Sequence, residues 1–251
     1  MNDFKRLEGK KIALIGGAGF IGHNLALHLQ SLGAKVDIID GMQVNNLLSL
    51  VDNVDNLPYP DLSRAIINER TQLLKSAQIN LRVQDARDYH ALTRLLNEIK
   101  PNIIIQLAAV SHANRSNKDP YSTFDHSFRT LENSLDWSRG GTSNVEQFIF
   151  FSSSMVYGNF ESDQVDEDTN CEPLGIYGAL KYGSEKIIIG YNQTFGLPYT
   201  IIRPSALYGE RCISRRVGQI FIENSLMGKE IVMSDKGKES LDFTYINDLV
   251  D

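Results

Sequence analysis

Short apolar runs alternate along the chain with longer segments whose apolar residues recur at helical spacing. Several runs are apolar almost without interruption, which is typical of strands that helices cover on both faces of a parallel sheet. The predicted strands are 11–15, 35–40, 79–83, 102–109, 147–153 and 199–204, and the predicted helices include 20–32, 88–99, 120–139 and 176–195. Strands and helices in this alternating order predict an α/β protein.

The expected fold is a Rossmann-like, doubly wound parallel sheet formed by residues 1–204. The connection at 41–78 is long for a crossover. After residue 204 the rhythm changes to a basic segment, a strand-like run at 231–234 and a final apolar pattern. We interpret residues 205–251 as the start of a smaller substrate-binding lobe that is incomplete in this sequence.

Composition narrows the class of protein without fixing its activity. The 251 residues are 42% hydrophobic and carry a formal charge of −6, so they offer no basic surface for nucleic acid. No segment approaches the roughly 18 apolar residues of a membrane span. Cys171 and Cys212 lie far apart and outside any metal-ligand spacing. We therefore expect a cytoplasmic protein with no metal, no membrane partner and no disulfide.

A glycine-rich loop follows the first predicted strand and opens a helix. In GGAGFIG, Gly16, Gly19 and Gly22 are spaced G-x-x-G-x-x-G. Glycine lets a backbone turn tightly and approach a pyrophosphate, and the N–H groups of a helix N-terminus favour an anion. The context predicts a dinucleotide site.

Asp40 ends the second predicted strand, where a carboxylate can accept hydrogen bonds from the ribose of adenosine. A carboxylate repels a 2′-phosphate, and the residues DGMQVNN after it supply no Arg or Lys to neutralise one. The sequence thus favours NAD over NADP. Asp85, after the third strand, is a candidate adenine contact or an acidic helix N-cap.

The pattern Tyr-x-x-x-Lys occurs twice in GIYGALKYGSEK, as Tyr177/Lys181 and as Tyr182/Lys186. Residues four apart share a helix face, whereas a shift of five turns the face by about 140°, so the two pairs cannot serve one site. A nearby cation favours the phenolate of a tyrosine, which otherwise has a pKa near 10. The pattern alone is also compatible with an exposed, soluble helix face.

Five motifs occur in a characteristic order and spacing: GGAGFIG, LAAVSH, FSSSMVYG, YGALK and IIRPSALYG. As a set they resemble the extended short-chain dehydrogenase/reductases, specifically the nucleotide-sugar epimerases and dehydratases. The resemblance implies a tightly held NAD, a catalytic Tyr-Lys pair with a Ser or Thr, and a C-terminal substrate lobe. DFTYINDLVD is similar to the late strand-helix element of that family.

The resemblance also assigns roles to particular residues. It matches the catalytic tyrosine and lysine to Tyr177 and Lys181, with Glu185 further along the same helix, and it places Tyr182 one turn too deep. Tyr177 also lies in the first turn, where the helix dipole stabilises a phenolate. Aligning on the VYG motif places Ser153 at the catalytic hydroxyl, which would orient the sugar hydroxyl.

The expected contacts fall into two groups. The candidate cofactor-binding residues are Gly16, Gly19, Phe20, Ile21, Gly22, Asp40, Asp85, Ala86, Leu107, Ala108, Ala109, Tyr177, Lys181 and Pro204. The candidate substrate-binding residues are Ser111, Ser153, Ser154 and Arg211. For Ser154 a structural role is an alternative. The arginines at 211, 215 and 216 could clamp a diphosphate or form a solvated helix face.

Departures from the family pattern bear on the reaction. The resembling 4,6-dehydratases carry an Asp and a Glu that eliminate water at the positions of Ser154 and Met155, and neither residue here can act as that acid/base pair. Ser127 and Ala206 stand where Asn is common in the family, which weakens any inference of substrate identity.

The leading hypothesis is therefore an NAD-dependent nucleotide-sugar epimerase acting at C4. The alternatives are a 4-dehydrogenase that releases a keto sugar and a non-catalytic NAD-binding regulatory protein. The resemblance suggests a homodimer with a four-helix interface built from helices 120–139 and 176–195, although these helices could equally just cover the sheet.

Overall fold

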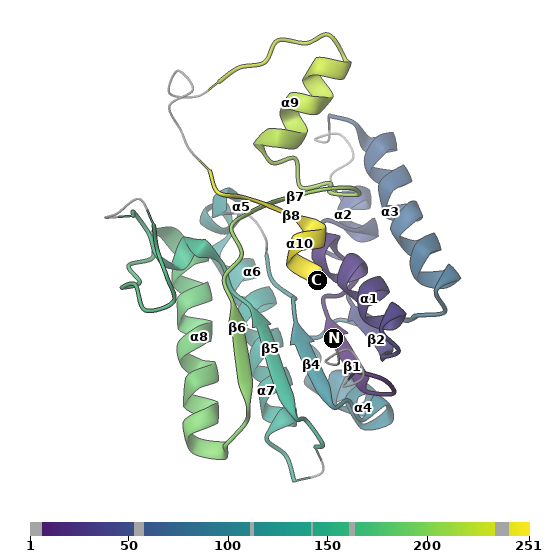
Figure 1. Cartoon of the computed structure of the whole chain (residues 1–251), viewed down its shortest axis with the longest axis vertical. Coiled ribbons are helices and arrows are strands. Elements are labelled where there is room, and N and C mark those ends of the chain that lie inside the picture. The colour runs from purple at the N-terminus through teal and green to yellow at the C-terminus, as the bar shows by residue number, and fades with distance from the viewer. Residues whose placement is uncertain (1–6, 53–57, 111–112, 142, 161–163, 234–240) are drawn as a thin grey trace.

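The computed structural model describes residues 7–52, 58–110, 113–141, 143–160, 164–233 and 241–251. Its main sheet has 6 strands in the order β3-β2-β1-β4-β5-β6, and every pair is parallel (Figure 1). The strands are β1 Lys11–Ile15, β2 Lys35–Asp40, β3 Asn80–Val83, β4 Ile103–Gln106, β5 Gln147–Phe151 and β6 Tyr199–Ile202. This order and pairing confirm the predicted Rossmann-like fold.

The strand order reverses between β1 and β4, because the chain crosses the sheet after β3. In open α/β sheets, ligands bind at such a switch point, outside the carboxyl ends of the strands. In register, Ile15 at the end of β1 pairs with Ile39 of β2 and with Gln106 of β4. The loops that follow these strands therefore leave the sheet at one edge.

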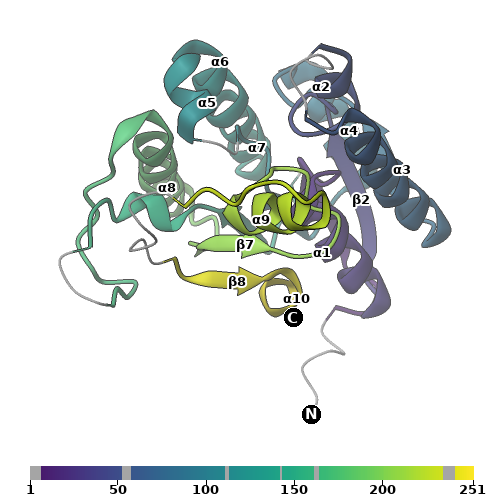
Figure 2. The same ribbon diagram turned by 90° about the horizontal axis from the view of Figure 1, so that it is seen from above.

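Helices cover both faces of the sheet (Figure 2). On one face, buried residues of α4 (Tyr89–Ile99), α7 (Thr130–Ser138) and α8 (Gly175–Phe195) form one hydrophobic cluster with the strands. On the other, α1 (Phe20–Ser31), α3 (Pro60–Ser76) and α10 (Ile246–Val250) contribute to a second cluster. Successive β1 residues alternate between the two clusters, as the two-residue period of a strand requires.

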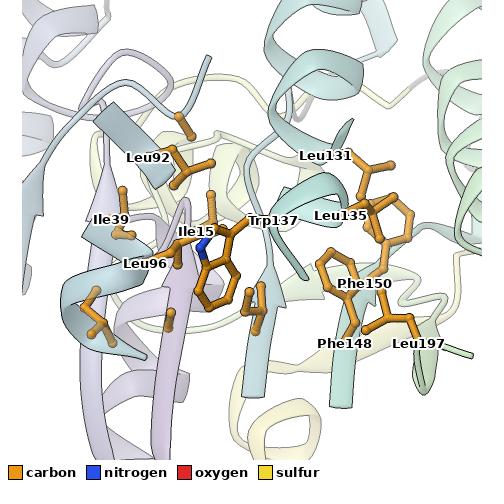
Figure 3. Close-up of a cluster of buried hydrophobic side chains, with 14 of the residues drawn as sticks. Ile15, Ile39, Leu92, Leu96, Leu131, Leu135, Trp137, Phe148, Phe150 and Leu197 are labelled. Atoms are coloured by element: carbon orange, nitrogen blue, oxygen red, sulfur yellow. The ribbon is translucent and has the colours of Figure 1, made fainter. Parts of the chain in front are cut away.

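Figure 3 shows how the first cluster joins strands to helices. Phe148 and Phe150 of β5 belong to it with Leu131 and Leu135 of α7, and all four side chains are at most 3% exposed. Trp137 keeps its polar atom satisfied, because its indole Nε1 donates to Asn97 Oδ1 at 2.9 Å. This packing fixes α7 and α8 beneath the carboxyl edge of the sheet.

The long connection at 41–78 holds two helices that the sequence analysis did not predict, α2 (Leu47–Asp52) and α3 (Pro60–Ser76). Proline at the first position of α3 suits a helix start, since its missing N–H would have no intrahelical partner there. Ile67 and Leu74 of α3 are buried. The length of this connection is thus explained by a packed helix.

The predicted helix at 120–139 is interrupted by one wider turn. The structure has α6 (Pro120–Phe124), a π-helical turn η3 (Asp125–Arg129) and then α7. The short helix α5 (Ala113–Lys118) precedes them. In the π turn, Ser127 Oγ accepts a hydrogen bond from the Val110 N–H at 3.4 Å. Such turns are frequent at functional sites.

After β6 the chain forms β7 (Ala206–Tyr208), α9 (Val217–Leu226), β8 (Phe243–Tyr245) and α10. The predicted strand at 231–234 is wrong for its described residues 231–233, which form neither strand nor helix. β7 and β8 pair in parallel, and α10 packs against α1. The last residues therefore complete a face of the Rossmann domain, while α9 stands out beyond the sheet edge (Figure 1).

Candidate functional site

A pocket lies at the carboxyl edge of the sheet. Every predicted cofactor-binding residue lines it, as does Ser153. Of the remaining predicted substrate residues, Ser154 and Arg211 are not among the described lining residues, and Ser111 lies outside the residues that the structure describes. One pocket thus joins the glycine loop at one end to Tyr177 and Lys181 at the other.

Gly16 allows the glycine loop to turn beneath the pocket. Its φ of 81° lies in the left-handed region, and a Cβ placed there would meet the backbone nitrogen of Ala108 at 2.5 Å. The close approach brings the end of β1 against the segment that follows β4. Any larger residue would separate these two walls of the pocket.

The N-terminus of α1 suits a phosphate. Gly19 is its N-cap, makes no side-chain capping bond, and is followed by no acidic residue in the first turn. A Cβ on Gly19 would meet only the Gly16 carbonyl oxygen, at 3.7 Å, so the glycine leaves open space on the pocket side. Uncapped N–H groups facing that space form a cradle for a pyrophosphate, and the residues present therefore fit a dinucleotide.

Asp40 is held in place by backbone donors. Its Oδ2 accepts from the Ala18 N–H at 2.9 Å and its Oδ1 from the Met42 N–H at 2.7 Å. Burial raises the pKa of Asp40, and these two hydrogen bonds oppose the rise. Each carboxylate oxygen keeps a second lone pair, so Asp40 can still accept hydrogen bonds from ribose hydroxyls.

Asp85 is already paired at the adenosine end. It forms a salt bridge with Arg87 at 2.6 Å and accepts from Gln43 Nε2 at 2.9 Å. Partial burial alone would raise the pKa of Asp85, but the hydrogen bonds from Arg87 and Gln43 hold it below its usual range. Asn133 of α7 donates to the Ala86 carbonyl at 2.9 Å and so fixes this turn.

Arg70 of α3 also lines the pocket, and sequence reasoning missed it. It is 2% exposed and donates from Nε to the Arg211 carbonyl at 3.0 Å. Burial lowers the pKa of Arg70 to about 10, and the charge of Asp40 is among the groups that oppose this. The adenosine end therefore has a cation from 30 residues beyond Asp40, although no basic residue lies near Asp40 in the sequence.

At the other end, Tyr177 and Ser153 line the pocket together, and the Ser153 hydroxyl is close enough to favour the phenolate of Tyr177. Tyr177 is in the first turn of α8, and Gly178 lets that turn pack closely, because a Cβ there would meet the Met155 carbonyl oxygen at 2.7 Å. Burial raises the pKa of Tyr177, while the Ser153 hydrogen bond and the positive charge of Arg216 oppose the rise.

Lys181 lies one turn beyond Tyr177 on the same face of α8. It is 7% exposed, and its Nζ donates to the Phe151 carbonyl at 2.6 Å. Burial lowers the pKa of Lys181 to about 8, and the Glu185 carboxylate opposes the shift. A lysine in this state remains largely charged at neutral pH and can stabilise a neighbouring phenolate.

The second Tyr-x-x-x-Lys pair, Tyr182 and Lys186, lies away from the pocket. Lys186 is exposed, and its Nζ stands 4.8 Å from the centre of the Tyr182 ring. Neither residue is among the described lining residues of the pocket. The geometry brings together Ser153, Tyr177 and Lys181 and leaves Tyr182 and Lys186 outside.

Beneath these residues lies a buried ion pair. Glu185 is 1% exposed and bonds to Arg203 Nη2 at 2.8 Å and to the hydroxyl of Ser152. Arg203 also donates to the Tyr157 hydroxyl at 3.0 Å. The pair joins the ends of β5 and β6 to α8, which are the segments that carry Ser153, Pro204 and Tyr177.

The three arginines of the C-terminal segment diverge. Arg216 lines the pocket near Tyr177. Arg215 pairs with Glu223 at 2.8 Å, and Arg211 reaches α1, where it contacts His23 and Asn24. Of the three arginines, one thus lines the pocket and the other two bind other parts of the protein.

Several lining residues were not predicted: Ile39, Gly41, Gln43, Val44, Asn45, Arg70, His126, Thr130, Phe151, Ser152, Leu207, Ile213 and Ser214. Most lie at the end of a strand or in the loop that follows one, a position that could have indicated them. Arg70, His126 and Thr130 come from helices, and only the packing of those helices turns them toward the pocket.

Together the fold and the site define a dinucleotide-binding α/β domain with a Ser, Tyr and Lys at one end of its ligand pocket. The chain belongs to the NAD dependent epimerase/dehydratase family, whose model matches residues 12–251. NAD is the cofactor of this family, and its members act on nucleotide sugars as epimerases and dehydratases.

Individual relatives have low sequence identity to this chain, but the similarity covers almost all of it. The uncharacterised UDP-glucose epimerase YtcB of Bacillus subtilis is 29% identical over 96% of this chain and 70% of its own length. The dTDP-glucose 4,6-dehydratase of Salmonella typhimurium is 27% identical over 95% of this chain and 66% of its own. UDP-glucuronic acid 4-epimerase from Bacillus cereus, solved with UDP-glucuronic acid and NAD, matches with a TM-score of 0.79 and 25% identity, covering 95% of this chain and 70% of that one.

Two further features concern partners. Among the described residues, no helix is both long and apolar enough to cross a membrane. The same part of the chain contains no cluster of side chains suited to holding a metal ion.

Proposed function

We propose that this protein is an NAD-dependent epimerase of a nucleotide-linked sugar and that it acts at C4. The observation that carries the proposal is the convergence of Ser153, Tyr177 and Lys181 at the end of a pocket whose other end holds the glycine loop and Asp40. Bound NAD would accept a hydride from the sugar carbon and return it.

The chain's own residues would move the proton and orient the sugar. Tyr177, as a phenolate, takes the proton of the sugar hydroxyl and returns it in the second half of the reaction. Ser153 lines the pocket beside Tyr177 and would hold the same sugar oxygen. Lys181 supplies the positive charge that lowers the pKa of Tyr177 once the pocket is filled, and Asp40 holds the ribose at the far end.

Epimerisation is favoured over dehydration by the side chains near Ser153. Elimination of water needs an acid to protonate the leaving hydroxyl. The carboxylates among the described lining residues are Asp40 and Asp85, both at the adenosine end. Ser154 and Met155 form the short turn η4 (Ser154–Val156) beside the catalytic serine, and neither can supply that acid.

The experiment is to incubate the purified protein with UDP-, GDP- and dTDP-sugars, separate the products and record the absorbance of NADH. We expect one sugar nucleotide to be converted to its epimer with no lasting NADH signal, and conversion by Tyr177→Phe to be slower by about 10³-fold. Accumulating NADH with a keto sugar would instead identify a 4-dehydrogenase. A protein that binds NAD but converts none of the panel would support a regulatory role.

We further propose a homodimer that works in the cytoplasm. Ile176 and Phe195 of α8 and Tyr121 and Phe124 of α6 are exposed apolar side chains on helices that flank one side of the sheet. Apolar surface of this kind supports association through α6 to α8. Both cysteines are free thiols, which suits a reducing compartment. Light scattering of the purified protein tests the dimer, and Phe124→Glu should shift it toward the monomer.

A further inference from the structure

The segment between β7 and α9 is fastened to the dinucleotide-binding half of the molecule. Figures 1 and 2 show the chain leaving β7 beside α1 before it enters α9. Ile213, Ser214 and Arg216 of this segment line the same pocket as the glycine loop and Asp40. The segment is therefore a wall of the pocket.

Three buried or half-buried side chains hold this wall. Arg211 donates from Nε to His23 Nε2 at 2.9 Å and from Nη2 to Asn24 Oδ1 at 3.0 Å, so its guanidinium is fixed on α1. The Arg211 carbonyl accepts from Nε and Nη2 of Arg70 on α3. Both the side chain and the backbone of Arg211 are thus bound to elements more than 140 residues away.

His23 extends this network to the phosphate loop. It is fully buried, and its Nδ1 lies 2.9 Å from the Gly19 carbonyl oxygen. Because a guanidinium can only donate, Nε2 must accept from Arg211 and Nδ1 must carry the proton that is given to Gly19. The same ring therefore bonds to the N-cap of the phosphate-binding helix and to the pocket wall.

The shape of this wall depends on these contacts more than on the backbone conformations that its own residues prefer. Arg211 has a φ of 65° and Arg215 a φ of 46°, in the left-handed region that residues with a Cβ rarely adopt. A segment with two such residues keeps this shape only when its surroundings hold it. Arg70 and His23 supply that restraint from the two elements next to the adenosine and phosphate ends of the pocket.

We propose that His23, Arg70 and Arg211 form a clasp that retains the bound dinucleotide by holding residues 211–216 against the pocket. This rests on the proposed function, since an epimerase must keep its cofactor between its two half-reactions. The clasp residues act as positioning residues and touch no reacting atom. Loosening them should speed the exchange of NAD while the catalytic residues stay intact.

The test measures NAD exchange directly. The protein is loaded with radiolabelled NAD, separated from free cofactor by gel filtration and chased with unlabelled NAD. We expect Arg211→Ala and His23→Asn each to release the label at least about tenfold faster than the wild type, because each removes a hydrogen bond to a charged group. His23→Asn retains a side-chain amide for the Gly19 carbonyl but has no atom at the Nε2 position.

Arg215→Ala is the matched control. Arg215 is an arginine of the same segment with the same left-handed backbone, but it contacts Glu223 and is not a described lining residue. It should release NAD within about twofold of the wild-type rate. The double variant Arg211→Ala with His23→Asn should be no faster than the faster single variant by more than about twofold, because both changes break the same bond.

Thermal melting without NAD verifies the fold of each variant, and Arg211→Lys replaces Arg211→Ala if the latter does not fold. Release at the wild-type rate by both folded single variants would overturn the clasp and leave the proposed function standing. Failure of the wild type to hold any NAD would overturn both.

Discussion

Two arginines, buried Arg70 and half-buried Arg203, lie beside the two ends of the pocket, and their pKa values move in opposite directions. At the catalytic end, the hydrogen bonds and charge of Glu185 raise the pKa of Arg203. At the adenosine end, burial lowers the pKa of Arg70 to about 10, and its guanidinium donates to the backbone carbonyls of Arg211 and Asn45. Arg203 is held by direct hydrogen bonds to a carboxylate, whereas Arg70 is held by carbonyls and remains a cation that lines the ligand pocket.

The contrast indicates that the catalytic end is built for rigidity and the adenosine end for binding a ligand. The matched pair of Glu185 and Arg203 fixes the segments that carry Ser153, Tyr177 and Lys181, as a reaction centre requires. The adenosine end leaves lone pairs on Asp40 and charge on Arg70 for a ligand to use. Changes at the first end should alter turnover or folding, whereas changes at the second should alter cofactor affinity.

The largest expected effect is that of Tyr177→Phe. Removing the proton acceptor should lower turnover by about 10³-fold, within the range for general acid-base groups. The NAD content of the purified variant should equal that of the wild type, because the glycine loop and Asp40 are untouched. Measuring turnover and the NAD released on denaturation in the same samples checks both expectations. A variant that keeps more than about a tenth of wild-type turnover contradicts the assigned role.

Next in size is the cost of breaking the buried pair. Glu185→Ala leaves Arg203 without its carboxylate, and unfolding free energy should fall by about 3 kcal/mol. Glu185→Gln keeps an acceptor for Arg203 and should lose clearly less. Urea denaturation of both variants measures this. Equal losses for Ala and Gln would show that packing, and not the charge, holds the three segments together.

The pH dependence of the unfolding free energy reports on the lowered pKa of Lys181. Its pKa is about 8 in the folded protein, below its ordinary value of 10.5, so the unfolded chain binds more protons between these two values. Stability should therefore rise with pH in that window, and the contribution of Lys181 between pH 8 and pH 10 is about 2 kcal/mol. Denaturation curves of Lys181→Met should lack this increment. An identical rise in the variant would assign it to other groups.

The smallest expected effect is that of Asp40→Asn. The amide offers one acceptor oxygen to two backbone donors, from Ala18 and Met42, and carries no charge for the ribose. We expect NAD affinity to fall by about tenfold, or roughly 1.4 kcal/mol, with turnover at saturating NAD unchanged. Calorimetric titration with NAD and NADP measures this. Discrimination against NADP should weaken as well, since the repulsive carboxylate is gone.

Much of the site could be predicted because it depends on local signals. The glycine loop and Asp40 lie at the ends of strands, where spacing indicates their place, and the family resemblance selects Tyr177 at the start of its helix. β1 and β2 have the predicted bounds, and each is rich in apolar residues over only five or six positions.

The rest depends on contacts between distant segments. Arg70 reaches the pocket because Ile67 and Leu74 bury one face of α3, and His23 meets Arg211 across 188 residues. No pattern in the sequence predicts either contact. The π turn at Asp125–Arg129 is also invisible there, because its residues fit an ordinary helix equally well.

One measurement tests the central claim most directly. The sugar nucleotide that the panel identifies is prepared with deuterium at C4 and incubated with the wild type and with Tyr177→Phe, and the product is followed by NMR. The proposed function predicts an epimer that keeps its deuterium at C4 and product formation that is about 10³-fold slower in the variant. An epimer that has exchanged its label with solvent, or one that the variant forms at more than about a tenth of the wild-type rate, would contradict it.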